Sequence, residues 1–144
     1  MKSIQPAVKF FIHLGKTQAI LSNRFDRGLG GLSFSEFLIL YYIGQAEGQK
    51  ISRIDLAKKI GMTASGVTRL LLPMEKVHLV KSGPQEQDAR IRYVMMSAAG
   101  KEKLAEAMER LEVLAEDIIP HSSVKEIESV SNLLLEIAAK TVLL

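Results

Sequence analysis

The sequence predicts a mainly α-helical protein with a small β-hairpin wing, built as a winged helix-turn-helix with further helices at both ends of the chain. Three observations predict this fold. Apolar residues recur at helical spacing along most of the chain, residues 52–77 form two short helical stretches joined by a Gly-Met turn, and two stretches of alternating polarity follow them. A chain of 144 residues, 47% of them hydrophobic, can form a core, and we expect one domain over residues 1–144.

Capping residues mark where the predicted helices begin. Ser33 and Glu36 form a capping box, in which the serine accepts from an amide of the first turn and the glutamate reaches back. Ser52 and Ser123 each precede an acidic residue at the same spacing, and Gly61 suits a left-handed helix end. The predicted helices lie at about residues 4–27, 34–46, 52–60, 64–77, 98–119 and 124–142.

The β-hairpin is predicted from two short alternating stretches. Residues 79–82 and 91–95 alternate apolar and polar side chains, and residues 83–89, which include Gly83 and Pro84, connect them. A third short strand is expected at residues 49–51, ahead of the first helix of the helix-turn-helix. The winged helix-turn-helix is therefore expected to span residues 33–98.

The helices outside this region carry apolar stripes that the small central region cannot cover. In the helix after Ser97 and in the last helix, apolar residues fall at alternating spacings of three and four, and the first helix offers a third apolar surface. Packing within one chain could explain these stripes. Three terminal helices around one small module instead favour a homodimer, with residues 1–32 and 99–144 as the dimerisation helices.

Charge is distributed unevenly along the chain. Residues 1–49 carry a net charge of +2, residues 50–92 carry +5 and residues 93–144 carry −4, within a total of +3. A basic middle segment beside an acidic end is typical of a module that binds a polyanion. The chain has no cysteine, which excludes thiolate metal sites and agrees with a cytoplasmic protein. Its longest apolar run, residues 37–43, is too short to span a membrane, so we expect no membrane partner.

The second helix of the pair has the side chains of a DNA-reading helix. Val67, Leu71 and their neighbours at helical spacing would face the core, which leaves small polar groups and one arginine outward. Arginine can pair with guanine through two hydrogen bonds, and serine or threonine can bond a base edge or a phosphate. The residues that we predict to contact double-stranded DNA from this helix are Thr63, Ser65, Gly66, Thr68 and Arg69.

The hairpin adds cations beside that helix. Lys81, Arg90 and Arg92 lie on its strands and tip, and Asp88 is placed to orient the guanidinium of Arg90 through a charge-assisted pair. An oriented arginine suits a narrow minor groove, where the negative potential is strong. We therefore include these four residues in the predicted DNA-binding site.

Three segments in register resemble the MarR family of bacterial transcription regulators. They are residues 56–70 (LAKKIGMTASGVTRL), residues 74–80 (MEKVHLV) and residues 88–100, with Asp-Ala-Arg and then VMMSAAG. The resemblance implies a homodimer that binds a pseudo-palindromic operator and usually represses transcription. It also implies that Ser65, Thr68 and Arg69 face the major groove and Arg90 the minor groove. His78 departs from the family pattern, which usually has glycine there.

Other functions fit the sequence less well than DNA binding. The three histidines are far apart in sequence, and no metal-spaced cluster or glycine-rich phosphate loop occurs, so we expect neither an enzyme nor a cofactor. A winged helix that binds a protein partner instead of DNA is the alternative. A small phenolic or carboxylate effector could bind between apolar walls and a polar anchor, although ordinary packing explains the same residues. These candidates are Phe11, His13, Lys16, Phe37 and Tyr41.

Overall fold

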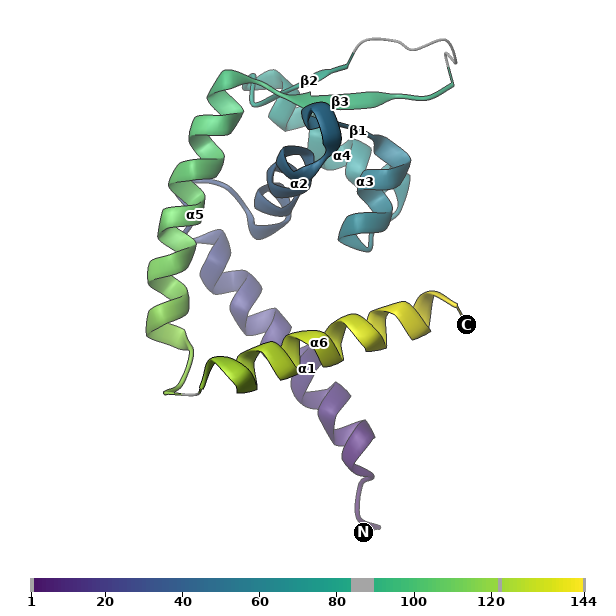
Figure 1. The fold of residues 1–144 in the computed structure, drawn as a ribbon, viewed down its shortest axis with the longest axis vertical. Helices are drawn as coiled ribbons and strands as arrows, with labels where there is room; N and C mark the ends of the chain where they lie inside the picture. The colour runs from purple at the N-terminus through teal and green to yellow at the C-terminus, as the bar shows by residue number, and fades with distance from the viewer. Residues whose placement is uncertain (1, 84–89, 122, 144) are drawn as a thin grey trace. The chain divides into compact units, whose positions relative to one another are not determined.

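The computed structural model describes residues 2–83, 90–121 and 123–143, and within them it contains six α-helices and three short strands (Figure 1). The chain divides into two compact units, Met1–Glu112 and Val113–Leu144. The predicted fold class is confirmed. In order, the elements are α1 (Pro6–Asp26), α2 (Phe34–Gln45), the 3-10 helix η1 (Glu47–Gln49), β1 (Lys50–Ser52), α3 (Arg53–Ile60), α4 (Ala64–Lys76), β2 (Val80–Ser82), β3 (Tyr93–Met96), α5 (Ala98–Ile118) and α6 (Val124–Val142).

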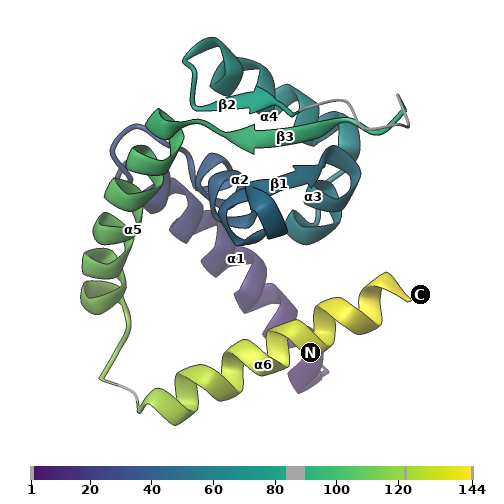
Figure 2. The same ribbon diagram turned by 45° about the horizontal axis from the view of Figure 1, so that its top comes forward.

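The three strands form one antiparallel sheet in the order β1-β3-β2. Ile51 of β1 lies opposite Val94 of β3, and Lys81 of β2 lies opposite Met95. The third strand expected from the sequence is therefore present, one residue later than predicted. Figure 2 shows that β3, the central strand, leads directly into α5.

The core of the first unit is built around α2. This helix is apolar on nearly all sides, as is typical of a helix that is covered by its neighbours. Side chains from α3, α4, the sheet and α5 close around it, together with two leucines from the turn between α1 and α2. The buried apolar residues of this unit are Leu29, Leu32, Phe37, Ile39, Leu40, Ile43, Leu56, Ala57, Val67, Leu71, Met74, Val80, Val94, Met96 and Ala107.

The predicted caps are present and explain where the helices start. The Ser33 hydroxyl accepts from the Glu36 amide at 3.1 Å, and the Glu36 carboxylate accepts from the Ser33 amide at 2.9 Å. Ser52 and Ser123 cap α3 and α6 in the same way, through single bonds. Gly61 ends α3 in the left-handed conformation, with φ +79°.

The helices at the ends of the chain leave apolar side chains exposed. No side chain of α1 or of α6 is buried, although each of these helices carries an apolar stripe. Such stripes are stable when another surface covers them. The exposed large apolar residues of the two helices are Val8, Phe11, Ile12 and Ile20 in α1, and Val124, Ile127, Val130, Leu133, Leu134, Leu135 and Val142 in α6.

His78 joins α4 to the sheet in a backbone conformation that favours glycine. Its φ is +62°, and its carbonyl accepts a hydrogen bond from the Ser97 hydroxyl at 2.5 Å. The hydroxyl shares this one proton with the Leu79 carbonyl, at 3.0 Å, and its oxygen accepts from the Gly100 amide at 3.0 Å, at the start of α5. These hydrogen bonds therefore hold the backbone of His78 in a conformation that costs free energy for any residue other than glycine.

We predict that His78→Gly stabilises the protein by about 1 kcal/mol, because glycine removes the steric cost of the positive φ and the exposed imidazole contributes little packing. Thermal or urea unfolding measures the change. His121→Gly is the matched control, since His121 is exposed and is not among the described non-glycine residues with positive φ. An equal or lower stability of His78→Gly would show that the turn is not strained.

Candidate nucleic-acid interface

A tight turn sets the angle between the two helices of the helix-turn-helix. The amides of Gly61 and Met62 both donate to the Ala57 carbonyl at 2.9 Å, so α3 ends abruptly. The Thr63 hydroxyl then caps α4 by accepting from the Gly66 amide at 3.1 Å. On the far side of α4, Val67 and its neighbours at helical spacing are fully buried, which fixes the rotation of the helix and turns its polar side outward.

The polar residues predicted on α4 divide into two groups. Ser65 and Arg69 are exposed in the first two turns, where a recognition helix contacts bases. Thr63 and Gly66 have structural tasks: the Thr63 hydroxyl also hydrogen-bonds that of Ser65 at 3.2 Å, and a Cβ on Gly66 would lie 3.2 Å from the Met62 and Thr63 side chains. The capping turn is therefore closely packed.

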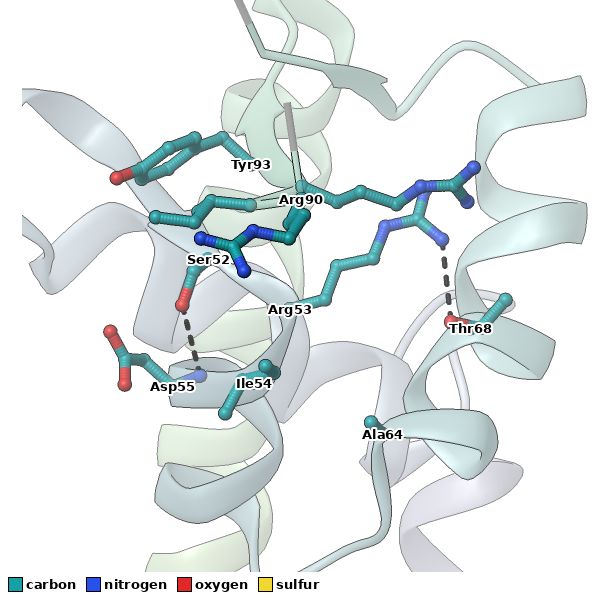
Figure 3. A pocket seen from close by; sticks show the side chains of 10 residues that line it. Ser52, Arg53, Ile54, Asp55, Ala64, Thr68, Arg90 and Tyr93 are labelled. Atoms are coloured by element: carbon teal, nitrogen blue, oxygen red, sulfur yellow. Dashed lines mark hydrogen bonds between the residues drawn. The ribbon is translucent and has the colours of Figure 1, made fainter. Parts of the chain in front are cut away.

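Thr68 is only half exposed, and its hydroxyl already has a partner. It accepts a hydrogen bond from Nη1 of Arg53 at 3.3 Å (Figure 3). Nη2 of the same arginine donates to the Glu75 carboxylate at 3.0 Å. Sequence reasoning did not single out Arg53. A signal existed, because a cation in the first turn of a helix opposes the helix dipole and so indicates a partner elsewhere in the fold.

The base of the wing lies beside these residues. Lys81, Arg90 and Arg92 are exposed, and the backbone carbonyl of Arg92 accepts from the Arg53 amide at 2.9 Å. This bond ties the wing to the start of α3. Asp88, which we predicted to orient Arg90, lies outside the described residues.

Two pockets open between α3, α4 and the wing. One has a volume of about 390 Å³ and the other about 420 Å³, and both are lined by Arg53, Thr68, Ile91, Arg92 and Tyr93. Arg90 lines the first pocket, which Figure 3 shows. Arg90 and Arg92, which are exposed, thus border one hollow of the surface together with Arg53, Asp55 and the start of α4.

The five residues predicted for an effector pocket have different environments. Phe11, His13 and Lys16 are exposed on α1, whereas Phe37 is buried in the core. Tyr41 is half-buried and stacks on Phe37, with 6.3 Å between the ring centroids. Tyr41 also lines a pocket of about 330 Å³ with residues of α2, β3 and α5, among them Lys101, and the other four candidates do not line that pocket.

Among the described residues, no group of three or more histidine, cysteine, aspartate or glutamate side chains is arranged to hold a metal ion. Within the same residues, no helix is both long and apolar enough to cross a membrane.

Comparisons with known proteins match this geometry. Residues 32–91 match the model of the MarR family. The uncharacterized HTH-type transcriptional regulator YdgJ of Bacillus subtilis is 26% identical over 110 residues, which cover 76% of this chain and 63% of that protein. The match thus spans less than two thirds of the relative's length.

Solved structures share the fold along nearly the whole chain. Sco3205, a MarR family transcriptional regulator from Streptomyces coelicolor in complex with DNA, has a TM-score of 0.79 at 16% identity, covering 96% of this chain and 90% of that one. The organohalide-sensing regulator RdhR, in its 2,4-dichlorophenol-bound form, has a TM-score of 0.83 at 16% identity, covering 96% and 83%. Residues 32–91, which contain the helix-turn-helix, thus match the MarR family, and the fold is similar to that of MarR family regulators such as Sco3205.

Proposed function

We propose that this protein is a transcriptional regulator that binds specific sequences of double-stranded DNA. The observation that carries the proposal is the exposed polar side of α4, with Ser65 and Arg69, beside exposed arginines at the base of the wing. A helix in the major groove next to a cationic wing is how winged helices read DNA. The DNA complex of Sco3205, which has the same fold, supports this assignment.

Each arginine has a distinct task in this proposal. Arg69 lies on α4, where its guanidinium can donate two hydrogen bonds to one guanine. Arg90 and Arg92 lie in the wing and meet the phosphates or the minor groove, so they add affinity with little sequence information. Asp88 and Lys81 complete the predicted contacts of the wing. A role in catalysis has no support from these side chains.

The protein acts as a homodimer in this proposal. One α4 and one wing read only half of a pseudo-palindromic operator, and two copies are needed to read both halves, about 34–36 Å apart. The exposed apolar stripes of α1 and α6 are the surfaces that a second copy would cover. The winged-helix protein-interaction module remains the second candidate, but the exposed residues in the first two turns of α4 include the polar Ser65 and Arg69.

We propose that the protein represses transcription and that a small aromatic effector relieves this repression. The protein would act in the cytoplasm, where the operator lies. RdhR was solved with 2,4-dichlorophenol bound, which supports a phenolic ligand. The pocket beside Tyr41 has apolar walls from Met96, Leu104 and Met108, and Lys101 offers a cation for a phenolate or carboxylate. Titration with 4-hydroxyphenylacetate and dichlorophenols that changed neither operator affinity nor thermal stability would remove this part of the proposal.

Selection of genomic fragments tests the proposed function directly. Purified full-length protein is mixed with fragments of genomic DNA, and the retained fragments are sequenced. We expect enrichment of a few sites that share an inverted repeat, with half-sites about one helical turn apart. Equal retention of all fragments, or of none, would contradict sequence-specific DNA binding and would favour the protein-interaction module.

We predict that Arg69→Ala and Arg90→Ala weaken binding in different ways. Arg69→Ala should lower discrimination between the selected site and single-base variants by about 1–3 kcal/mol at one base pair, because a base contact is lost. Arg90→Ala should weaken binding to all sequences alike and reduce the salt dependence. Fluorescence anisotropy at several salt concentrations measures both effects.

Arg24→Ala provides the control for these two variants, since Arg24 is an exposed arginine in the last turn of α1. It should bind like the wild type. Full affinity and full discrimination in both Arg69→Ala and Arg90→Ala would refute the assignment of the reading face.

We predict that Val130→Asp weakens dimerisation at least tenfold, because it places a charge in the exposed apolar stripe of α6. Sedimentation equilibrium should give twice the 15.9 kDa chain mass for the wild type and a concentration-dependent decrease for the variant. Ser131→Asp adds the same charge at the neighbouring exposed position and should leave the dimer intact. A monomeric wild type, or equal behaviour of both variants, would contradict the proposed interface.

A further inference from the structure

Arg53 occupies a position in the fold that needs an explanation. It is the first residue of α3, its side chain is only 11% exposed, and it opposes the dipole of its own helix. Burying a cation costs free energy that one ion pair does not reliably return, so an apolar side chain would serve stability as well or better. The identity of this residue therefore calls for a reason beyond stability.

Arg53 forms hydrogen bonds with the two elements proposed to contact DNA, α4 and the wing. Nη1 donates to the Thr68 hydroxyl at 3.3 Å and Nη2 to the Glu75 carboxylate at 3.0 Å, so one guanidinium holds α4 at two points that are seven residues apart. Its backbone amide donates to the Arg92 carbonyl at 2.9 Å. A single residue thus links the helix that precedes the turn, the reading helix and the wing.

The bond to Thr68 restricts what that hydroxyl can do. A hydroxyl has one proton to donate and two lone pairs that accept, and one lone pair is taken by Arg53. Threonine has few χ1 rotamers, so the bond also favours one orientation of the side chain. A hydroxyl held in this way is prepared to donate its proton to an acceptor, such as N7 of a purine or a phosphate oxygen.

We propose that Arg53 is a positioning residue for DNA recognition, which acts through Thr68 to set the preference at the base pair that Thr68 meets. This inference rests on the proposed function, because it assumes that α4 reads DNA. A direct contact between Arg53 and a phosphate is the competing role. Two observations argue against a phosphate contact: the side chain of Arg53 is only 11% exposed, and both of its Nη atoms already donate hydrogen bonds within the protein. The remaining nitrogen, Nε, is buried and has no hydrogen-bond partner among the described residues.

A double-mutant cycle on DNA binding separates these roles. Wild type, Arg53→Gln, Thr68→Val and the double variant are titrated against the selected operator and against operators changed at one base pair at a time. We expect each single variant to lose about tenfold in discrimination at the same base pair, and the double variant to lose no more than either single one. Non-additivity of this kind is the signature of a residue that acts through another.

Two further variants separate the geometry of the Arg53 side chain from its charge and provide a control. Arg53→Lys keeps the cation but cannot bridge Thr68 and Glu75 through a planar fork, so it should lose the same discrimination while keeping the wild-type salt dependence. Arg27→Gln removes an exposed arginine and should change neither quantity. Circular dichroism and thermal unfolding establish that each variant is folded, and Thr68→Val at the half-exposed surface of α4 serves if Arg53→Gln does not fold.

The outcomes are distinct. Additive losses at different base pairs, or a salt dependence that falls by about one counterion in Arg53→Gln and not in Thr68→Val, would overturn the positioning role in favour of a phosphate contact. Unchanged discrimination in Arg53→Gln and Arg53→Lys would reduce Arg53 to a structural residue. A wild type that selects no fragment would overturn the proposed function itself, and this inference with it.

Discussion

The burial of one side of α4 is the constraint on which the rest of the structure depends. Val67, Leu71 and Met74 have no exposed surface, and full burial of each such side chain is worth about 1.5–3 kcal/mol. An exposed ion pair contributes about 0–1 kcal/mol, so the core sets the rotation of the helix and the polar contacts only refine it. Because the apolar side is fixed inward, Ser65 and Arg69 have to face solvent, and the surface they form is a direct consequence of packing.

The sheet connects this surface to the remainder of the first unit. The central strand β3 pairs on one side with β1, which precedes α3 in the sequence, and on the other side with β2, which follows α4. At its end, β3 continues through Ser97 into α5. The Ser97 hydroxyl joins the end of α4, through the carbonyls of His78 and Leu79, to the first turn of α5. A shift of the first turn of α5 would therefore disturb the bonds of Ser97 to the segment between α4 and β2.

Sequence reasoning found what local chemistry determines. The serine caps, the left-handed Gly61 and the helical spacing of apolar residues involve partners a few residues apart, and these predicted the six helices and the hairpin well. The sequence did not predict η1, nor the role of Arg53, whose partners Thr68 and Glu75 lie 15 and 22 residues away. Phe37, one of the residues predicted for an effector pocket, is buried in the core. Contacts between distant residues depend on how helices pack, which periodicity alone does not specify.

In the proposed homodimer, the exposed apolar stripes at the chain ends would raise DNA affinity through multivalency. One reading helix and one wing make few contacts, and a single half-site complex is accordingly weak. When two copies are joined, the second half-site is bound at an effective concentration in the millimolar range, which can raise affinity by about 10²–10⁴ without any new contact to DNA. This gain is lost if the spacing of the two reading helices does not match the operator. The stripes of α1 and α6 would then determine affinity and half-site spacing, although none of their side chains needs to touch DNA.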